Sequence, residues 1–108
     1  MSATLVLQDL TRLEQLYAAG FHDSFLDNAL RKMIARQIAR DEADLTRLTP
    51  ALAEFERATG MSSDEFWRRY QAGKMADTAD AMEWNALCKM RQRIMARLEI
   101  LRGARAHA

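Results

Sequence analysis

Three carboxylates and a tryptophan in the last third of the chain have the spacing that most suggests chemistry. Asp77, Asp80 and Glu83 follow one another at intervals of three residues, and Trp84 comes directly after them. On a helix this spacing places the three acids along one side of the first turns. Acids at a helix N-terminus complement the helix dipole, which explains them without any function. The alternative is an acidic recognition patch with Trp84 as the anchor for a basic partner. A metal site is the weakest interpretation, since successive turns rarely converge on one ion.

The end of the chain has a surplus of basic residues. Residues 89–108 carry six basic and one acidic side chain, whereas residues 1–88 carry ten basic and fourteen acidic ones. Arg93, Arg97 and Arg105 could form a basic face that contacts phosphates. However, this stretch has no Tyr or Phe for base stacking, and a net charge of +1 is too balanced to coat nucleic acid. A solvated helix end explains these arginines more simply, so we expect at most weak contact with nucleic acid.

Groups that could catalyse a reaction are few. Cys88 is the single cysteine, and neither His22 nor His107 has a Ser or Cys partner at a recognisable spacing. The Glu-x-x-His pairs of di-iron bundles are missing, and the four glycines fall at predicted helix ends and not in a phosphate loop. The sequence therefore predicts a protein that is not an enzyme and holds no metal or cofactor.

Cysteine usage and hydropathy bound the location of the protein. A lone cysteine supports no disulfide framework, which suits a reducing compartment. No apolar run of 18 residues occurs, and the N-terminus does not follow the pattern of a secretory signal. We expect a cytoplasmic protein with no membrane association.

Aromatic residues gather on both sides of the acidic stretch. Phe66, Trp67 and Tyr70 precede Trp84 within nineteen residues, and most of this cluster is expected to close one end of a helical core. Phe66 and Trp67 are adjacent, so on a helix they point about 100° apart. One of them could be exposed, and Trp67 is therefore a second candidate for contact with a partner protein.

The composition of the chain predicts an all-α fold. Its 108 residues make one domain, and Ala, Leu, Lys, Arg and Glu together supply about half of them. Val occurs once and Ile four times, so the β-branched residues of a sheet are scarce. We predict an elongated antiparallel helical hairpin, or coiled coil, with a short N-terminal helix and a short connector helix.

Apolar spacing and capping signals predict four helices, at about residues 4–18, 23–59, 63–71 and 77–102. The second has a heptad seam from Ile34 to Thr59 with one acidic interruption at Asp41, and as one helix it would span about 55 Å. Pro50 lies inside this seam, where it either kinks a single helix or starts a new one. We favour the kink, because the heptad phase continues through Pro50. Gly60 and a capping box from Ser62 to Glu65 mark the next boundary.

A family resemblance rests on the segment FERATGMSSDEF, residues 55–66, and on the later residues Gly73, Asp77, Asp80 and Glu83-Trp84. It resembles a family of small helical proteins with the pattern FE-x-x-YGM-x-S-x-EF, G-E-x-GD and D-x-x-EW, which are similar to antitoxins of bacterial toxin–antitoxin modules. The likeness extends over about residues 20–101. This chain departs from the pattern at three positions, since Thr59 replaces Tyr, Lys74 replaces Glu and Ala76 replaces Gly.

The resemblance implies an antitoxin-like protein that binds and neutralises a cognate toxin. It supplies no catalytic residues, and it implies partner contacts only at Asp77, Asp80, Glu83 and Trp84. The other interpretations are a structural or adaptor coiled-coil protein and, less favoured, a helical subunit that binds nucleic acid. A thin hairpin leaves part of each apolar stripe uncovered, so we also expect a homo-oligomer.

Overall fold

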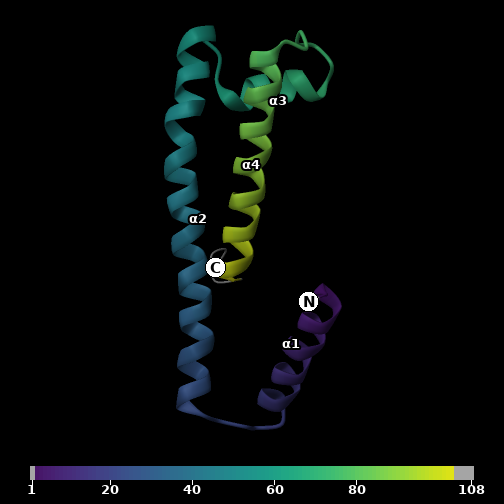
Figure 1. The fold of residues 1–108 in the computed structure, drawn as a ribbon, viewed down its shortest axis with the longest axis vertical. Helices are drawn as coiled ribbons and strands as arrows, with labels where there is room; N and C mark the ends of the chain where they lie inside the picture. The colour runs from purple at the N-terminus through teal and green to yellow at the C-terminus, as the bar shows by residue number, and fades with distance from the viewer. Residues whose placement is uncertain (1, 104–108) are drawn as a thin grey trace. The chain divides into compact units, whose positions relative to one another are not determined.

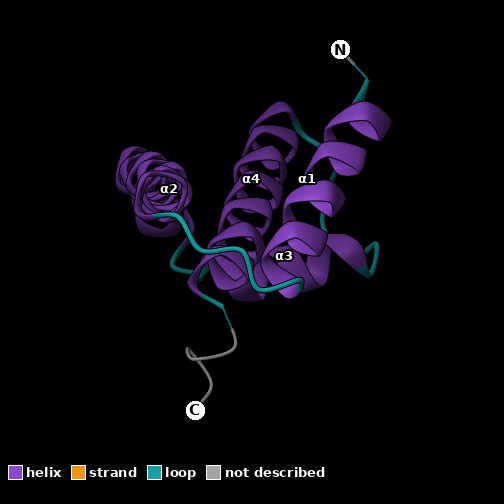
Figure 2. Ribbon diagram, turned by 90° about the horizontal axis from the view of Figure 1, so that it is seen from below, coloured by secondary structure: helices purple, strands orange, loops and turns teal. Residues whose placement is uncertain are grey.

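The computed structural model of the protein describes residues 2–103. This part of the chain forms four helices joined by loops, with no strand (Figure 2). The helices are α1 (Ala3–Ala18), α2 (Ser24–Thr59), α3 (Ser63–Gln71) and α4 (Ala79–Arg102). The all-α fold class predicted from composition is therefore confirmed. The chain divides into two compact units, Met1–Met33 and Ile34–Ala108.

The first unit holds α1 and the first turns of α2. Ser2 caps α1, because its hydroxyl accepts a hydrogen bond from the Leu5 amide at 3.3 Å. Asp23 caps the start of α2, because its carboxylate accepts a hydrogen bond from the Leu26 amide at 2.9 Å. The Tyr17 hydroxyl donates a hydrogen bond to the Asp27 carboxylate at 2.6 Å, which ties the two helices together. This bond raises the pKa of Tyr17 to about 12, because losing the proton would break it.

The second unit is an antiparallel hairpin built from the rest of α2, with α4 running back beside it and α3 as the connector (Figure 1). At one end Arg97 and Arg102 of α4 bind Asp41 and Glu42 of α2. At the other end Phe55 of α2 stacks on Trp84 of α4. Residues early in α2 thus lie beside residues late in α4, and the reverse holds at the other end. The two helices are therefore antiparallel, as the hairpin prediction requires.

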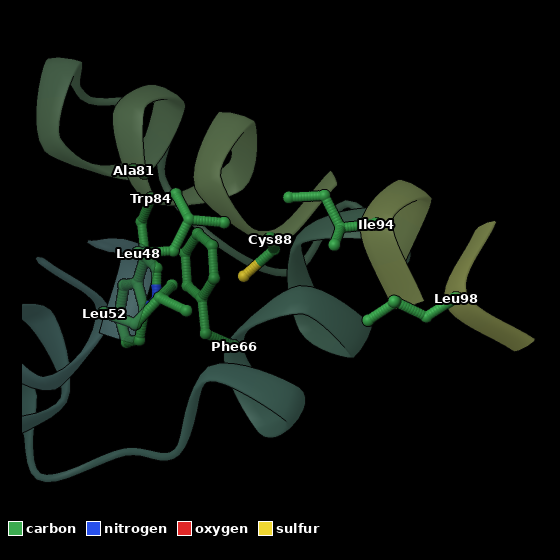
Figure 3. Packing of buried hydrophobic residues seen from close by; sticks show 8 residues of the cluster. All are labelled: Leu48, Leu52, Phe66, Ala81, Trp84, Cys88, Ile94 and Leu98. Atoms are coloured by element: carbon green, nitrogen blue, oxygen red, sulfur yellow. The ribbon is translucent and has the colours of Figure 1, made fainter. Parts of the chain in front are cut away.

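The hydrophobic core of this unit lies among its three helices, and Figure 3 shows its side chains gathered there. The predicted seam of α2 faces this core, since Leu48 and Leu52 are buried and Ile38, Leu45 and Phe55 pack against the cluster. Eight buried hydrophobic residues form the core: Leu48, Leu52, Phe66, Ala81, Trp84, Cys88, Ile94 and Leu98.

Local signals explain where the helices begin and end. α2 passes through Pro50 as one helix, so no new helix starts there. It ends at Thr59, and the next residue, Gly60, has a φ of 70°, a left-handed conformation that favours glycine. Ser62 caps α3 by accepting the Glu65 amide hydrogen at 3.1 Å, whereas the Glu65 carboxylate pairs with Arg68 and Arg69 further along the helix.

Candidate binding surfaces

Trp84 belongs to the core and is not the exposed anchor that the acidic patch would need. Only 2% of its surface is accessible to solvent. Its indole ring is stacked between Phe66, at a centroid distance of 4.0 Å, and Phe55, at 5.4 Å. A partner protein could therefore contact the indole ring of Trp84 only if this core opened. The heptad stripe of α4 carries Trp84 toward α2, and an aromatic side chain on that stripe is buried with its neighbours.

The indole N–H of the buried Trp84 has a hydrogen-bond acceptor in the core, the side chain of Ser63. The Trp84 indole nitrogen donates a hydrogen bond to the Ser63 hydroxyl oxygen at 3.0 Å, and both residues are buried. The Ser63 backbone amide donates to the Glu56 carboxylate at 2.7 Å. Hydrogen bonds from the backbone and side chain of Ser63 lower the pKa of Glu56. Ser63 thereby links α2, α3 and α4 through one small side chain.

The three predicted acidic residues do not form one helical row. α4 begins at Ala79, with Thr78 as its N-cap, so Asp77 precedes the helix. The Asp77 carboxylate accepts a hydrogen bond from the Tyr70 hydroxyl at 2.7 Å, which closes the loop between α3 and α4. Asp80 and Glu83 are exposed on the first turns of α4. They remain available to a partner, whereas Asp77 has a structural role in the loop.

The second tryptophan is half-buried. Trp67 packs against the edge of the core, while its neighbour Phe66 is buried inside it. The divergence expected for adjacent positions on a helix is thus present. The Trp67 indole nitrogen is buried and has no hydrogen-bond partner within residues 2–103. Because the side chain is only half-buried, part of Trp67 remains available to a partner protein.

A small apolar pocket lies above the aromatic stack. Its volume is about 320 Å³, and Phe55, Phe66 and Trp84 all contribute to its wall. Asp80 is the single carboxylate among its lining residues. The pocket is large enough for one apolar side chain, and Asp80 would favour a positively charged group beside it.

The three predicted nucleic-acid contacts do not make a common basic face. The Arg97 guanidinium is held by two hydrogen bonds to the Asp41 carboxylate, at 2.8 and 2.9 Å. Arg93 forms no hydrogen bond or ion pair within the described part of the chain, and Arg105 lies outside the described residues. With Arg97 committed to an acid, the phosphate-binding interpretation has little support.

The acidic interruption in the seam of α2, Asp41, is a buried residue of the hairpin, and the sequence pattern does not identify its partner. Asp41 is 1% exposed, and its carboxylate also accepts a hydrogen bond from Gln37 at 3.0 Å. The hydrogen bonds from Arg97 hold the pKa of Asp41 below its ordinary value. An acid in an apolar seam signals a buried pair, but the spacing could not select Arg97 from the several arginines of α4.

A second pocket, of about 460 Å³, lies between α2 and α4. Arg47 pairs with Asp44 at its edge. Three apolar and three basic side chains contribute most of its lining: Leu48, Met90, Ile94, Arg47, Arg93 and Arg97. This combination suits an acidic side chain that approaches along an apolar surface.

The candidate nucleophile of the chain is enclosed. Cys88 is 1% exposed, and burial raises the pKa of its thiol, which keeps it in the unreactive protonated form. The His22 imidazole lies 3.8 Å from the Asp27 carboxylate in the first unit. Within residues 2–103, no group of three or more His, Cys, Asp or Glu residues is arranged to hold a metal ion. None of the described helices has the length and apolar content needed to cross a membrane.

Most of the exposed large hydrophobic residues of the first unit lie on α1. None of the sixteen residues of α1 is buried. Val6, Leu10, Leu13 and Tyr17 recur at helical spacing; Leu13 and Tyr17 are half-buried, but Val6 is 43% and Leu10 is 49% exposed. Leu5 and Leu7 are more exposed still. A helix with this many open leucines is typical of a segment that binds another surface.

In comparisons with protein-family models, curated proteins and solved structures, nothing was found to match this chain.

Proposed function

We propose that this chain is a non-enzymatic binding protein whose α1 helix lays its apolar face on a partner protein. The observation that carries the proposal is the complete lack of buried residues on a helix with exposed Val6 and Leu10. The matching partner surface is an apolar groove about 24 Å long, the length of a sixteen-residue helix. A helix that is ordered beforehand loses less entropy on binding than a disordered peptide does.

The kind of partner follows from the resemblance of residues 55–66 and their downstream motif. We propose an antitoxin-like role, in which the chain neutralises a cognate toxin in the cytoplasm by covering its functional surface. Burial of Trp84 moves the main contact away from the acidic turns of α4 and toward α1. Asp80 and Glu83 remain exposed and can steer a basic partner toward the complex without anchoring it.

The test uses the product of the gene that neighbours the gene for this chain. We expect that product alone to arrest growth of a bacterial host, and co-expression of the full chain to restore it. The two proteins should also purify together in a fixed ratio. Leu10→Glu should abolish both effects, because it places a charge in the middle of the apolar face of α1.

The matched control is Gln8→Glu, which introduces the same charge on the polar side of α1. It should bind and protect as the unmodified chain does, and both variants should keep their helical circular dichroism. The antitoxin proposal is overturned if the neighbouring product is harmless and does not bind. The assignment to α1 is overturned if Leu10→Glu binds and protects normally.

A structural or adaptor coiled-coil protein is the second candidate. The 36-residue helix α2 favours it, since helices of that length are typical of spacers and coiled coils. A neighbouring product that binds the chain but does not affect growth would support the adaptor role.

A further inference from the structure

One flank of α4, which borders α2 at Met90, Arg93 and Arg97, has a second heptad pattern that the hydrophobic core does not use. Its positions are separated by four, three, four, three and four residues, and every one of them is exposed. They are Ala79, Glu83, Ala86, Met90, Arg93 and Arg97. The core of the hairpin uses the other face of α4, with residues such as Trp84 and Leu98.

This flank is symmetric about the level of Cys88. Glu83 lies five residues before Cys88, and Arg93 lies five residues after it. Ala86 and Met90 lie two residues before and two residues after it. In each pair the two sides complement each other, with an acid matched to a base and a small side chain to a long one.

From this symmetry we infer that a second copy of the chain packs antiparallel on this flank of α4, with the two-fold axis at the level of Cys88. Each Glu83 then meets Arg93 of the second copy, and each Met90 fills the space above Ala86 of the second copy. A two-fold axis forms both contacts twice. A parallel arrangement would place Glu83 against Glu83 and Arg93 against Arg93, and like charges would oppose it.

The pocket between α2 and α4 can accommodate the Glu83 carboxylate of the second copy. Met90 and Arg93 both line this pocket of about 460 Å³, so Glu83 of a second copy reaches it along the apolar surface of Met90. Arg97 is bound to Asp41 and Arg47 to Asp44. Arg93 forms no hydrogen bond or ion pair with any other residue that the structure describes, so its guanidinium is the one that can receive Glu83.

The contact is short and charged, which determines how it should behave in solution. Residues 79–97 span about 27 Å of helix, so the apolar area on this face is limited. The two Glu83–Arg93 pairs lie on either side of the central Ala86–Met90 contacts, and both side chains are exposed, so salt can screen them. Dimerisation should therefore be moderate in strength and should weaken as salt is added. It uses the second unit alone and is independent of the partner proposed for α1.

Sedimentation equilibrium on the full chain tests this inference. The unmodified protein should shift from about 12 kDa to about twice that mass as its concentration rises through the micromolar range. Glu83→Arg alone and Arg93→Glu alone should each raise the dimer dissociation constant at least tenfold, because the two-fold axis duplicates every repulsive contact. The double variant Glu83→Arg with Arg93→Glu restores both pairs and should return the constant to within about threefold of its original value.

The matched control is Glu54→Arg, which makes the same charge change at an exposed position of α2. It should leave the dissociation constant unchanged, and helical circular dichroism should confirm that every variant folds. A mass of about 12 kDa at all concentrations overturns the inference. So does a charge-swapped double variant that dimerises no better than the single variants. Loss of toxin neutralisation by Leu10→Glu with an intact dimer would show that the α1 contact and the dimer are separate.

Discussion

Asp41 and Ser63 are the two buried polar residues of the described chain, and each connects α2 to another helix. Asp41 binds Arg97 of α4 through two hydrogen bonds, and Ser63 accepts one from Trp84 while donating to Glu56. A buried polar group that loses its partner is costly, because water cannot replace the lost bond. These residues therefore fix how the helices meet, and their substitution has consequences that can be measured.

The first prediction concerns the pH dependence of stability. Arg97 holds the pKa of Asp41 below its ordinary value of 3.8. The resulting stabilisation is fully present above that value and is lost as the pH falls through the folded-state pKa. In thermal unfolding between about pH 5 and about pH 2, the Tm of the unmodified chain should fall more steeply than that of Asp41→Asn.

Two features make this comparison specific. Glu56 also has a lowered pKa, but it titrates in both proteins, so the difference between their slopes isolates Asp41. The exposed Asp9→Asn serves as the control and should keep the unmodified slope. Equal slopes for Asp41→Asn and the unmodified chain would contradict the role given to the Asp41–Arg97 pair.

The second prediction concerns Ser63. In Ser63→Ala the Trp84 indole nitrogen keeps its place in the core but loses its acceptor, which should lower the free energy of unfolding by about 1–3 kcal/mol. Urea unfolding followed by tryptophan fluorescence measures this loss, and the emission of the folded state should shift with the environment of Trp84. The neighbouring variant Ser62→Ala removes the α3 cap instead. It should cost about 1 kcal/mol without shifting the emission, and an identical shift in both would count against the Ser63–Trp84 bond.

At the scale of the elements, Pro50 is the main irregularity. It sits on the exposed side of α2, inside a helix that continues nine residues beyond it to Thr59. A proline in a helix interior cannot donate a backbone hydrogen bond and crowds the preceding turn. Thr46 and Thr49 donate their hydroxyls to the backbone of the turn before them, as such residues do where a helix adjusts locally.

The third prediction follows from this placement. Pro50→Ala should raise the free energy of unfolding by about 1–3 kcal/mol, because alanine restores the hydrogen bond and removes the steric crowding. Thermal and urea unfolding measure the gain, with the exposed Ala53→Gly as a control that should destabilise α2 by about 1 kcal/mol. A loss of stability in Pro50→Ala would mean that the proline shapes α2 for packing against α4.

At the scale of the whole molecule, the two units differ in how much they bury. Every buried residue of the described chain belongs to the second unit, and α1 contributes none. Local opening costs little where few apolar contacts must be broken. The units should therefore differ in dynamics even though both are helical.

The fourth prediction concerns hydrogen exchange on the full chain. Backbone amides of α1 should exchange orders of magnitude faster than those around Leu52 and Trp84. Binding of the partner proposed for α1 should slow exchange in that helix, whereas dimerisation through α4 should leave it unchanged. Protection of α1 as strong as that of α4 in the isolated chain would contradict the interpretation of α1 as an exposed binding helix.

Much of the fold could be predicted from the sequence, because helix formation depends on local composition and spacing. The abundance of Ala and Leu, the heptad seam of α2 and the Ser62 cap each act within a few residues of the chain. They predicted the fold class and the hairpin, and the predicted helix ends lie within two residues of those in the structure. The symmetric spacing on the flank of α4 is also present in the sequence, but only the structure shows that this flank lies outside the hydrophobic core.

Only the tertiary structure shows which of the candidate site residues are buried and which residues they contact. The pattern that placed Trp84 beside three acids could not show that Phe55 and Phe66, from two other helices, enclose its ring. Nor could it show that Tyr70 binds Asp77, or that Arg97 is the arginine that reaches Asp41. Burial and long-range pairing depend on which faces of distant helices meet. That choice minimises the free energy of the whole core and cannot be read from the spacing within one helix.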